Sequence, residues 1–192
     1  VEEALNQENL EITDKNIQSL EDLSHFANLK SLNAGSNNIS DLTGLEGLTQ
    51  LTHIYLNSNQ IDDISVFHHL TNVTWIAIYS NNITDLSPIE NLTNITHLEA
   101  DGNPIESLQP ISNFTLLETL WITDSTVPQS EFNEVVSNLT NLKNLYITNN
   151  SFLTDVTFLQ QLPQLVYVDI RSNGGLTDVN VNSVKDYFSN LG

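Results

Sequence analysis

Apolar residues recur along the chain in a repeating unit, and residues 75–83 show it clearly. Two isoleucines separated by one residue, Ile76 and Ile78, are followed three places later by Asn81. The same spacing recurs 22 residues earlier and 22 residues later. The first apolar position of each unit falls at Leu10, Leu32, Ile54, Ile76, Leu98, Leu120, Leu145 and Val168, with spacings of 22 residues until the last two, which are 25 and 23. A regular period predicts a chain built from stacked copies of one structural unit.

Within each unit the polar and apolar positions predict a short strand, a turn and a compact outer segment. The two apolar residues that open a unit, such as Leu32 and Ala34, point to one side because alternate side chains of a strand share a face. Leucines at intervals of three, such as Leu45, Leu48 and Leu51, are typical of tight 3-10 turns rather than of a long helix. A period in the twenties with this composition is the signature of leucine-rich repeats. The sequence therefore predicts an α/β solenoid, a right-handed curved superhelix with parallel strands on the concave side and 3-10 or helical segments on the convex side.

Polar residues at fixed repeat positions are predicted to support this framework. Asparagine carries a donor and an acceptor on a short side chain, so its copies can satisfy backbone groups where the chain turns. The expected ladder comprises Asn37, Asn59, Asn81, Asn103, Asn150 and Asn173, with Lys15 and Ser125 interrupting it. Asp41, Asp63 and Asp85 also share one position, where we expect each carboxylate to accept from nearby backbone N–H groups rather than to bind calcium.

The ends and the sixth unit depart from the repeat. Residues 1–9 precede the register and have the composition of a remnant of a helical N-terminal cap. Residues 10–179 form the predicted solenoid of about eight repeats, and residues 180–192 are predicted to form a closing helix or the start of a further repeat. In the sixth unit, residues 130–139 carry apolar side chains at helical spacing, which predicts an amphipathic helix on the convex side.

Composition narrows the classes of partner. The 192 residues include 24 acidic and only 5 basic ones, giving a net charge of −19. Such a charge disfavours nucleic acid and anionic membrane surfaces and favours solubility and a basic partner. Cysteine is absent and no apolar run has transmembrane length, so we expect neither a disulfide framework nor membrane insertion. No phosphate loop, nucleophile motif or spaced metal-ligand set occurs, so we expect no enzyme activity and no cofactor.

The repeat resembles that of the internalin family, surface proteins of Gram-positive bacteria. The resemblance lies in the unit Leu-x-Leu-x-x-Asn-x-Ile-x-Asp-Leu-x-x-Leu-x-x-Leu-Thr-x-Leu, and residues 82–95 match it most closely. It extends over residues 10–179, although intracellular phosphatase-regulating proteins share the 22-residue class. The internalin resemblance implies a curved solenoid whose concave sheet binds a host or surface protein, outside the cell as a surface or secreted protein.

Residues between the framework positions are predicted to face out of the concave sheet. These are the residue before each first apolar position and those two and four places later in the strand. Both tryptophans and four of the five tyrosines occur there, whereas all seven phenylalanines fall elsewhere. Tryptophan and tyrosine favour interfaces because they combine apolar area with a polar handle. The predicted partner-binding strip comprises His53, Tyr55, Asn57, Trp75, Tyr79, His97, Glu99, Asp101, Trp121, Tyr146, Tyr167, Asp169 and Arg171. Ala77, a small residue between Trp75 and Tyr79, is expected to leave a notch.

Two other chemistries fit parts of this strip. His53 and His97 stand two repeats apart, about 10 Å by the strand spacing, which is too far for two imidazoles to share one ion. A pH-sensitive hydrogen-bonding patch suits them better than a metal site. Arg171 lies beside Asp169, where it forms either a local ion pair or a contact to the partner.

Three functions remain open from the sequence. The first is a non-enzymatic module of a bacterial surface protein that binds a protein partner through the aromatic strip. The second is a glycan-binding adhesin in which the same rings stack on sugars. The third is an intracellular scaffold of the phosphatase-regulator kind.

Overall fold

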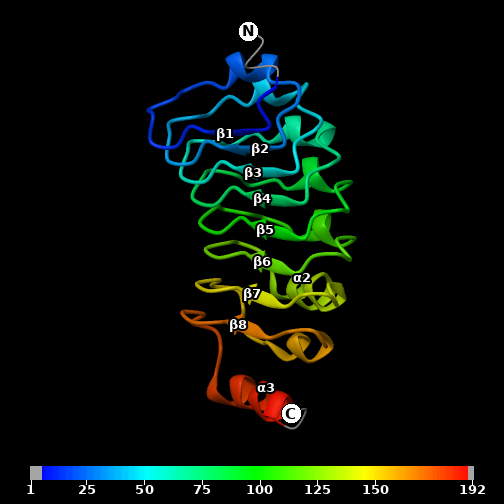
Figure 1. The fold of residues 1–192 in the computed structure, drawn as a ribbon. Helices are drawn as coiled ribbons and strands as arrows, with labels where there is room; N and C mark the ends of the chain where they lie inside the picture. Colours follow the sequence, from blue (N-terminus) through cyan, green and yellow to red (C-terminus); the bar gives the residue numbers. More distant parts are fainter. Residues whose placement is uncertain (1–5, 190–192) are drawn as a thin grey trace.

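The chain forms one open sheet of eight parallel strands stacked in sequence order (Figure 1). The computed structural model describes residues 6–189. Each strand is three residues long, and the next strand along the chain is always its neighbour in the sheet. The strands are β1 (Asn9–Glu11), β2 (Ser31–Asn33), β3 (His53–Tyr55), β4 (Trp75–Ala77), β5 (His97–Glu99), β6 (Thr119–Trp121), β7 (Asn144–Tyr146) and β8 (Tyr167–Asp169). The predicted leucine-rich repeat solenoid is thereby confirmed.

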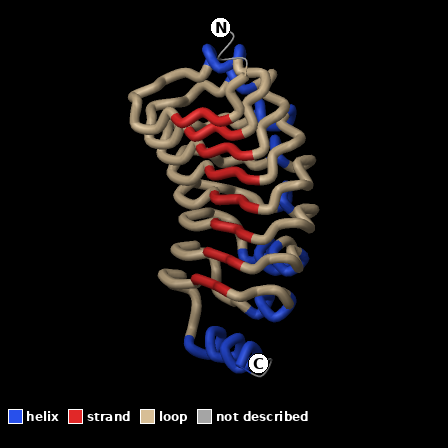
Figure 2. Tube along the Cα trace, in the orientation of Figure 1, coloured by secondary structure: helices blue, strands red, loops and turns tan. Residues whose placement is uncertain are grey.

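Short helical segments return the chain between strands and lie together on one side of the sheet (Figure 2). Most are 3-10 turns, as the leucine spacing predicts, and the sixth repeat carries the expected α-helix. Phe132 of that helix is fully buried, which anchors it to the core. The segments are η1 (Glu21–His25), η2 (Thr43–Leu45), η3 (Ser65–His69), η4 (Ser87–Ile89), η5 (Gln109–Ile111), α2 (Gln129–Glu134), η6 (Val136–Asn138) and η7 (Thr157–Gln161). A longer helix, α3 (Asp178–Ser189), follows β8 and lies at the end of the stack.

The strands are paired in register throughout. Ile54 pairs with Ile76, which pairs with Leu98, and the two facing residues of each strand pair in the same way. The longer sixth repeat does not shift this alignment, because Leu120 still pairs with Leu145. The three additional residues of that repeat therefore lie outside the sheet, in the segment that contains α2.

The core lies between the sheet and the helical side. The middle residue of each strand from β2 to β7 is fully buried, and the apolar residue two places later is buried with it. The outer leucines, such as Leu45, Leu48 and Leu51, close the core from the other side. Because each repeat covers its neighbour, a continuous hydrophobic core runs from Leu20 to Leu162.

The asparagine ladder is present as predicted. The Asn81 side-chain amide donates to the carbonyl oxygens of Leu56 at 3.0 Å and Ile78 at 2.9 Å. Its Oδ1 atom accepts from the backbone N–H of Ile61 at 3.0 Å. The amide thus links two successive repeats and satisfies backbone groups that the short strands leave unpaired. Ser125 interrupts the ladder, as expected, and donates its hydroxyl to the next rung, Asn150.

A left-handed residue precedes the ladder position in each repeat. Its φ lies between 54° and 62° in every copy, a region that non-glycine residues adopt at a cost of about 1 kcal/mol or more. This residue turns the chain from the strand into the ladder position. The copies are Asp14, Ser36, Ser58, Ser80, Gly102, Asp124, Asn149 and Ser172.

The repeated aspartates have the structural role that was predicted for them. Asp41 accepts from the backbone N–H of Thr43 at 2.9 Å, and Asp63 accepts from that of Ser65 at 2.7 Å. Asp85 accepts from both the backbone N–H and the hydroxyl of Ser87. Each carboxylate therefore fixes the start of the 3-10 turn that follows it.

The two terminal segments are described only in part. Residues 1–5 of the expected cap remnant lie outside the described residues, and Asn9 already belongs to β1. The segment expected at 180–192 is helical as far as Ser189, since α3 begins at Asp178. Across residues 6–189 no helix combines the length and apolar character needed to cross a membrane.

Candidate functional site

The predicted strip lies on the exposed face of the sheet, which we call the sheet face. Its residues form columns that run across the strands. One column contains His53, Trp75 and His97 in direct register, and the next contains Tyr55, Ala77 and Glu99. A third column lies just past the strand ends and contains Asn57, Tyr79 and Asp101. Backbone hydrogen bonds continue there, since the N–H of Ser58 donates to the carbonyl of Tyr79 and the N–H of Ser80 donates to that of Asp101. All thirteen predicted residues belong to these three columns, over β3 to β8.

The rings of the first part of the sheet face form a contiguous group on β3, β4 and β5. The Trp75 indole stacks on the His97 imidazole with ring centroids 3.9 Å apart and planes 1° from parallel. On its other side, Trp75 contacts His53 and Tyr55, each with centroids 6.1 Å away. We call His53, Tyr55, Trp75 and His97 the first ring group.

Three rings form a second group on β6, β7 and β8. The Trp121 and Tyr146 rings have centroids 4.0 Å apart, and those of Tyr146 and Tyr167 are 5.1 Å apart. No ring contact joins this second ring group to the first within the described residues. The rings of the predicted strip are thus divided into two groups, and the first ends at His97 on β5. At the next position of the column that contains His97, β6 carries Thr119, and the other two outward positions of the β5 repeat carry Glu99 and Asp101.

Glu99 and Asp101 occupy the gap between the ring groups. Burial raises the pKa of the Glu99 carboxyl, and the charge of Asp101 raises it further, whereas the nearby Trp75 indole lowers it. Burial likewise raises the pKa of Asp101, its own backbone N–H opposes the shift, and the charge of Asp124 adds to the rise. The strip therefore has a partly desolvated acidic centre.

Two buried polar atoms at this centre lack a hydrogen-bond partner. They are Nε1 of Trp75 and Oδ1 of Asp101, and among the described side chains no other buried nitrogen or oxygen shares this state. The Trp75 nitrogen lies toward Glu99 without completing a hydrogen bond of normal geometry. Buried polar groups are nearly always paired, so an unpaired donor on β4 and an unpaired acceptor just past β5 are unusual.

The tyrosines beside the acidic centre respond to its charge. Burial raises the pKa of Tyr55, and the negative charge of Glu99 adds to the rise. The pKa of Tyr79 is raised by burial and then by both Glu99 and Asp101. These hydroxyls therefore remain protonated at neutral pH and are available as hydrogen-bond donors to a partner.

The two histidines of the first ring group share one arrangement. His53 Nδ1 lies 2.9 Å from the Thr52 hydroxyl, and His97 Nδ1 lies 3.0 Å from the Thr96 hydroxyl. Each threonine donates its single hydroxyl hydrogen to a backbone carbonyl of the preceding repeat. A tautomer that carries its hydrogen on Nδ1 satisfies both contacts of the threonine hydroxyl.

Protonation of His97 is disfavoured. Burial lowers its pKa, and although the charge of Glu118 opposes this, His53 and Lys143 lower the pKa further. In the described part of the chain, no three His, Asp or Glu side chains come together in a way that could hold a metal ion.

The surroundings of Ala77, Asn57 and Gly35 on the sheet face differ from those expected of fully exposed residues. Ala77 is only 2% exposed, so the expected notch is wrong: the surrounding side chains cover the small residue. The Asn57 amide lies over Gly35, where an added Cβ would meet Asn57 Oδ1 at 2.7 Å. Gly35 therefore permits Asn57 to lie across the neighbouring repeat.

Asp169 and Arg171 form the local ion pair that was one of the two expected alternatives. Arg171 Nε donates to one carboxylate oxygen at 2.9 Å, and Nη2 donates to the other at 2.6 Å. The hydrogen bonds from Arg171 lower the pKa of Asp169. Asp169 is buried while the Arg171 side chain is 82% exposed, so the guanidinium covers the carboxylate at the end of the strip.

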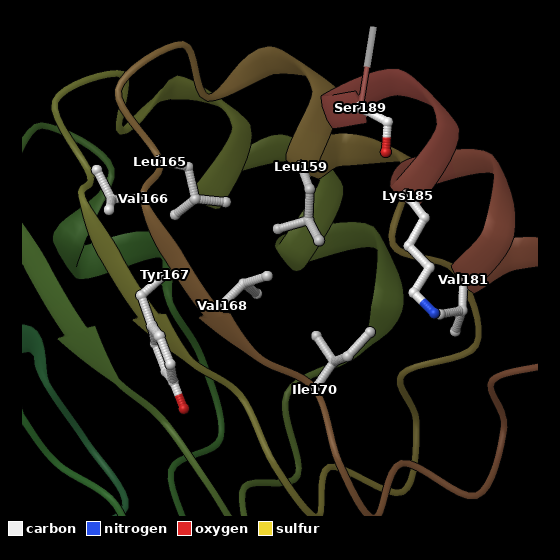
Figure 3. Close-up of a pocket in the computed structure, with 9 residues that line it drawn as sticks. All are labelled: Leu159, Leu165, Val166, Tyr167, Val168, Ile170, Val181, Lys185 and Ser189. Carbon is white, nitrogen blue, oxygen red and sulfur yellow. The ribbon is translucent and has the colours of Figure 1, made fainter. Parts of the chain in front are cut away.

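A cleft at the C-terminal end was not predicted from the sequence. It has a volume of about 630 Å³ and lies between the last repeat and α3 (Figure 3). Leu165, Val168 and Ile170 line it and are partly exposed, whereas their counterparts in the preceding repeat, Leu142, Leu145 and Ile147, are fully buried. The periodicity treats all eight repeats alike and so cannot show that the last one is covered less completely.

Comparison with known proteins agrees with this architecture. The family described as Leucine Rich repeats (2 copies) matches residues 27–69. An internalin (inlF) of Listeria monocytogenes superposes with a TM-score of 0.83 over 93% of this chain, at 29% sequence identity. The chain has the leucine-rich repeat fold. Internalin C2 (inlC2) of the same species gives a TM-score of 0.73 over 92% of this chain, at 25% identity.

A leucine-rich repeat protein of Leptospira interrogans shows the same fold, with a TM-score of 0.80 over 95% of this chain and 23% identity. This leucine-rich repeat chain spans 58% of inlF, 83% of internalin C2 and 47% of the Leptospira protein. No curated protein matches the sequence. We therefore describe the chain as a leucine-rich repeat protein-interaction scaffold that resembles internalins.

Proposed function

We propose that the sheet face binds a protein partner, and that the chain belongs to a bacterial protein that acts at the cell surface or after secretion. The observation that carries this proposal is the separation of ring types. Both tryptophans and four of the five tyrosines lie on the sheet face, within or just after β3 to β8, whereas no phenylalanine occupies these positions: Phe67, Phe114 and Phe132 are fully buried in the core, and Phe152 is exposed away from the strands. Tryptophan and tyrosine dominate the binding energy of protein interfaces, and their placement on the exposed face serves recognition rather than packing.

The shape and charge of the face support a protein partner. Eight aligned strands present the three columns as one continuous surface, with both ring groups partly exposed and an acidic centre between them. With a net charge of −19, the chain attracts partners that carry positive charge. The similarity to internalins, which are named as such in two solved structures, favours the extracellular setting.

Replacement of four rings tests the binding face. The variant carries Trp75→Ala, Tyr79→Ala, Trp121→Ala and Tyr146→Ala, and we expect affinity for the partner to fall by more than about 100-fold because buried interface rings are typical hot spots. Partners are captured from host-cell and bacterial-envelope extracts, identified by quantitative mass spectrometry, and measured as purified proteins by calorimetry. Circular dichroism checks that the variant keeps the solenoid.

A matched control variant carries four alanine substitutions outside the sheet face. It carries His68→Ala, His69→Ala, Leu116→Ala and Phe152→Ala, which are exposed residues away from the strands. This control should bind the partner as well as the parent chain. Equal affinity of the ring variant and the parent would contradict the proposal, and so would a glycan array on which the parent chain binds sugars while no purified protein binds. Fractionation of native cells with an antibody to the chain tests the location, and recovery in the cytosolic fraction alone would exclude a surface role.

A further inference from the structure

The acidic centre of the sheet face has no cation of its own. Glu99 and Asp101 are alternate residues of one strand and its extension, so both carboxylates project from the same face about 7 Å apart. Three ion pairs occur in the described part of the chain, and none of them includes either residue. The pairs are Lys30 with Glu8, Lys143 with Glu118, and Arg171 with Asp169. Two carboxylates that are partly desolvated and lack a counter-ion favour the approach of a positive group.

A ring stands on each side of these carboxylates. Trp121 on β6 is the register partner of Glu99, and Tyr79 after β4 occupies the position that neighbours Asp101. Adjacent strands lie about 4.8 Å apart, so the residues that carry these two rings stand diagonally on either side of Glu99 and Asp101. A cation held there would meet negative charge below and aromatic rings at both sides, a combination that favours cation–π contacts.

The unpaired atoms at the centre give a second, independent indication. Asp101 Oδ1 is a buried acceptor without a donor, although the rest of the described structure satisfies nearly all its buried polar side chains. Oδ1 itself is closed to solvent, but Asp101 as a whole is partly exposed, so a donor group of a partner can approach this carboxylate at its exposed part. A guanidinium suits the place better than an ammonium, because its planar fork can donate to more than one carboxylate oxygen while it lies against a ring.

We propose that the centre of the sheet face binds an arginine side chain of the partner, with Glu99 and Asp101 accepting from the guanidinium and Tyr79 and Trp121 flanking it. This inference rests on the proposed function, since it names the group of the protein partner that occupies the middle of the same face. The overall negative charge of the chain agrees with a partner segment that is basic around this arginine.

A small probe tests the site without knowledge of the partner. Nα-acetyl-arginine methylamide is titrated into the full chain, and the indole Nε1–H signals are followed by two-dimensional NMR. The chain contains two tryptophans, so Trp121→Phe assigns both signals. We expect a saturable shift of the Trp121 signal, and no saturable shift with the neutral isostere Nα-acetyl-citrulline methylamide. The double variant Glu99→Gln, Asp101→Asn should bind the arginine probe at least tenfold more weakly.

Glu11→Gln provides the matched control, because Glu11 lies on the same sheet face in β1, four strands away from the centre. This variant should bind the arginine probe as the parent chain does. The inference is overturned if the arginine probe gives no saturable shift, if citrulline binds equally well, or if the double variant binds unchanged. If one of these results is obtained but the four-ring variant still loses its partner, the arginine site is overturned and the proposed function is not. Retention of the partner by the four-ring variant would instead overturn the proposed function itself.

Discussion

Each strand of this solenoid carries two sets of residues that obey different rules. On β4, Ile76 points inward, and its equivalents across β2 to β7 are all leucine or isoleucine and fully buried. The outward residues Trp75 and Ala77 differ in type from their register partners on β3 and β5. Inward positions are constrained by the core of both neighbouring repeats, whereas outward positions are constrained only by each other. Stability is thus assigned to the inward residues, and the proposed recognition to the outward residues, of the same three-residue strand.

The inward set should dominate stability. We expect Leu98→Ala to lower the free energy of unfolding by about 3 kcal/mol, because a fully buried leucine leaves a cavity between two repeats. His97→Ala, one residue away on the outward side, should lower it by less than about 1.5 kcal/mol, the range of a single ring contact. Urea unfolding followed by circular dichroism measures both values. Equal losses would show that the two sets are not separable.

Substitutions in the asparagine ladder should have the next largest effect on the free energy of unfolding. Asn81→Ala leaves the carbonyls of Leu56 and Ile78 and the N–H of Ile61 without this partner, and we expect a loss of about 2 kcal/mol. Asn57→Ala changes the same residue type on the sheet face and should lower the free energy of unfolding by about 0.5 kcal/mol or less. The same unfolding assay compares them, and a larger loss for Asn57 would reverse the assignment of roles.

The acidic centre should oppose stability at neutral pH. Burial and the charge of Asp101 raise the pKa of Glu99 in the folded chain, and the smaller effect of Trp75 opposes them. The folded state therefore holds the proton more tightly than the unfolded state does. Stability therefore falls as pH rises from the unfolded value through the higher folded value, and remains lower above both. Glu99→Gln removes this loss and should raise Tm at pH 7, with little difference from the parent below about pH 4.

Glu118→Gln is the control of opposite sign. Hydrogen bonding to Lys143 lowers the pKa of Glu118, so its charged form stabilises the fold at neutral pH and that contribution is lost as pH falls through the folded pKa. This variant should lower Tm at pH 7 slightly. Thermal unfolding at several pH values separates the two cases. A Tm of Glu99→Gln below that of the parent at pH 7 would show that the centre is not strained by its charge.

The smallest effect is expected at the turn that separates outward from inward residues. Ser58 has a φ of 54°, where glycine has no steric penalty, so Ser58→Gly should raise the free energy of unfolding by about 0.5 kcal/mol. Ser40 has an ordinary negative φ, and Ser40→Gly should lower it by a similar amount because glycine gains freedom in the unfolded chain. Calorimetric unfolding resolves such shifts in Tm. The same sign for both variants would contradict the strain assigned to the turn.

Periodicity predicts the backbone well and the side-chain contacts less well. The positions of Leu10, Leu32 and their counterparts are sufficient to place all eight strands, because the first apolar residue of each repeat marks the middle of its strand whatever the length of the repeat. It also places the ladder and identifies α2. It cannot predict that the Trp75 ring stacks on His97, that Ala77 is covered, or which rings contact one another, since these depend on side-chain rotamers. The partial exposure of Leu165 and Val168 likewise depends on what stacks against the final repeat, and not on the repeat itself.

The constant register of the sheet has a consequence for the distance between the two ring groups. Every additional residue of repeats six to eight lies outside the strands, so the sheet face advances by one strand spacing, about 4.8 Å, for each repeat whatever its length. Deleting or duplicating one whole repeat between Trp75 and Trp121 would therefore shorten or lengthen the separation of the ring groups in steps of that size. Repeat number thus sets how far apart the two ring groups stand, and with them the two contact points of the proposed partner, independently of which residues make the contacts.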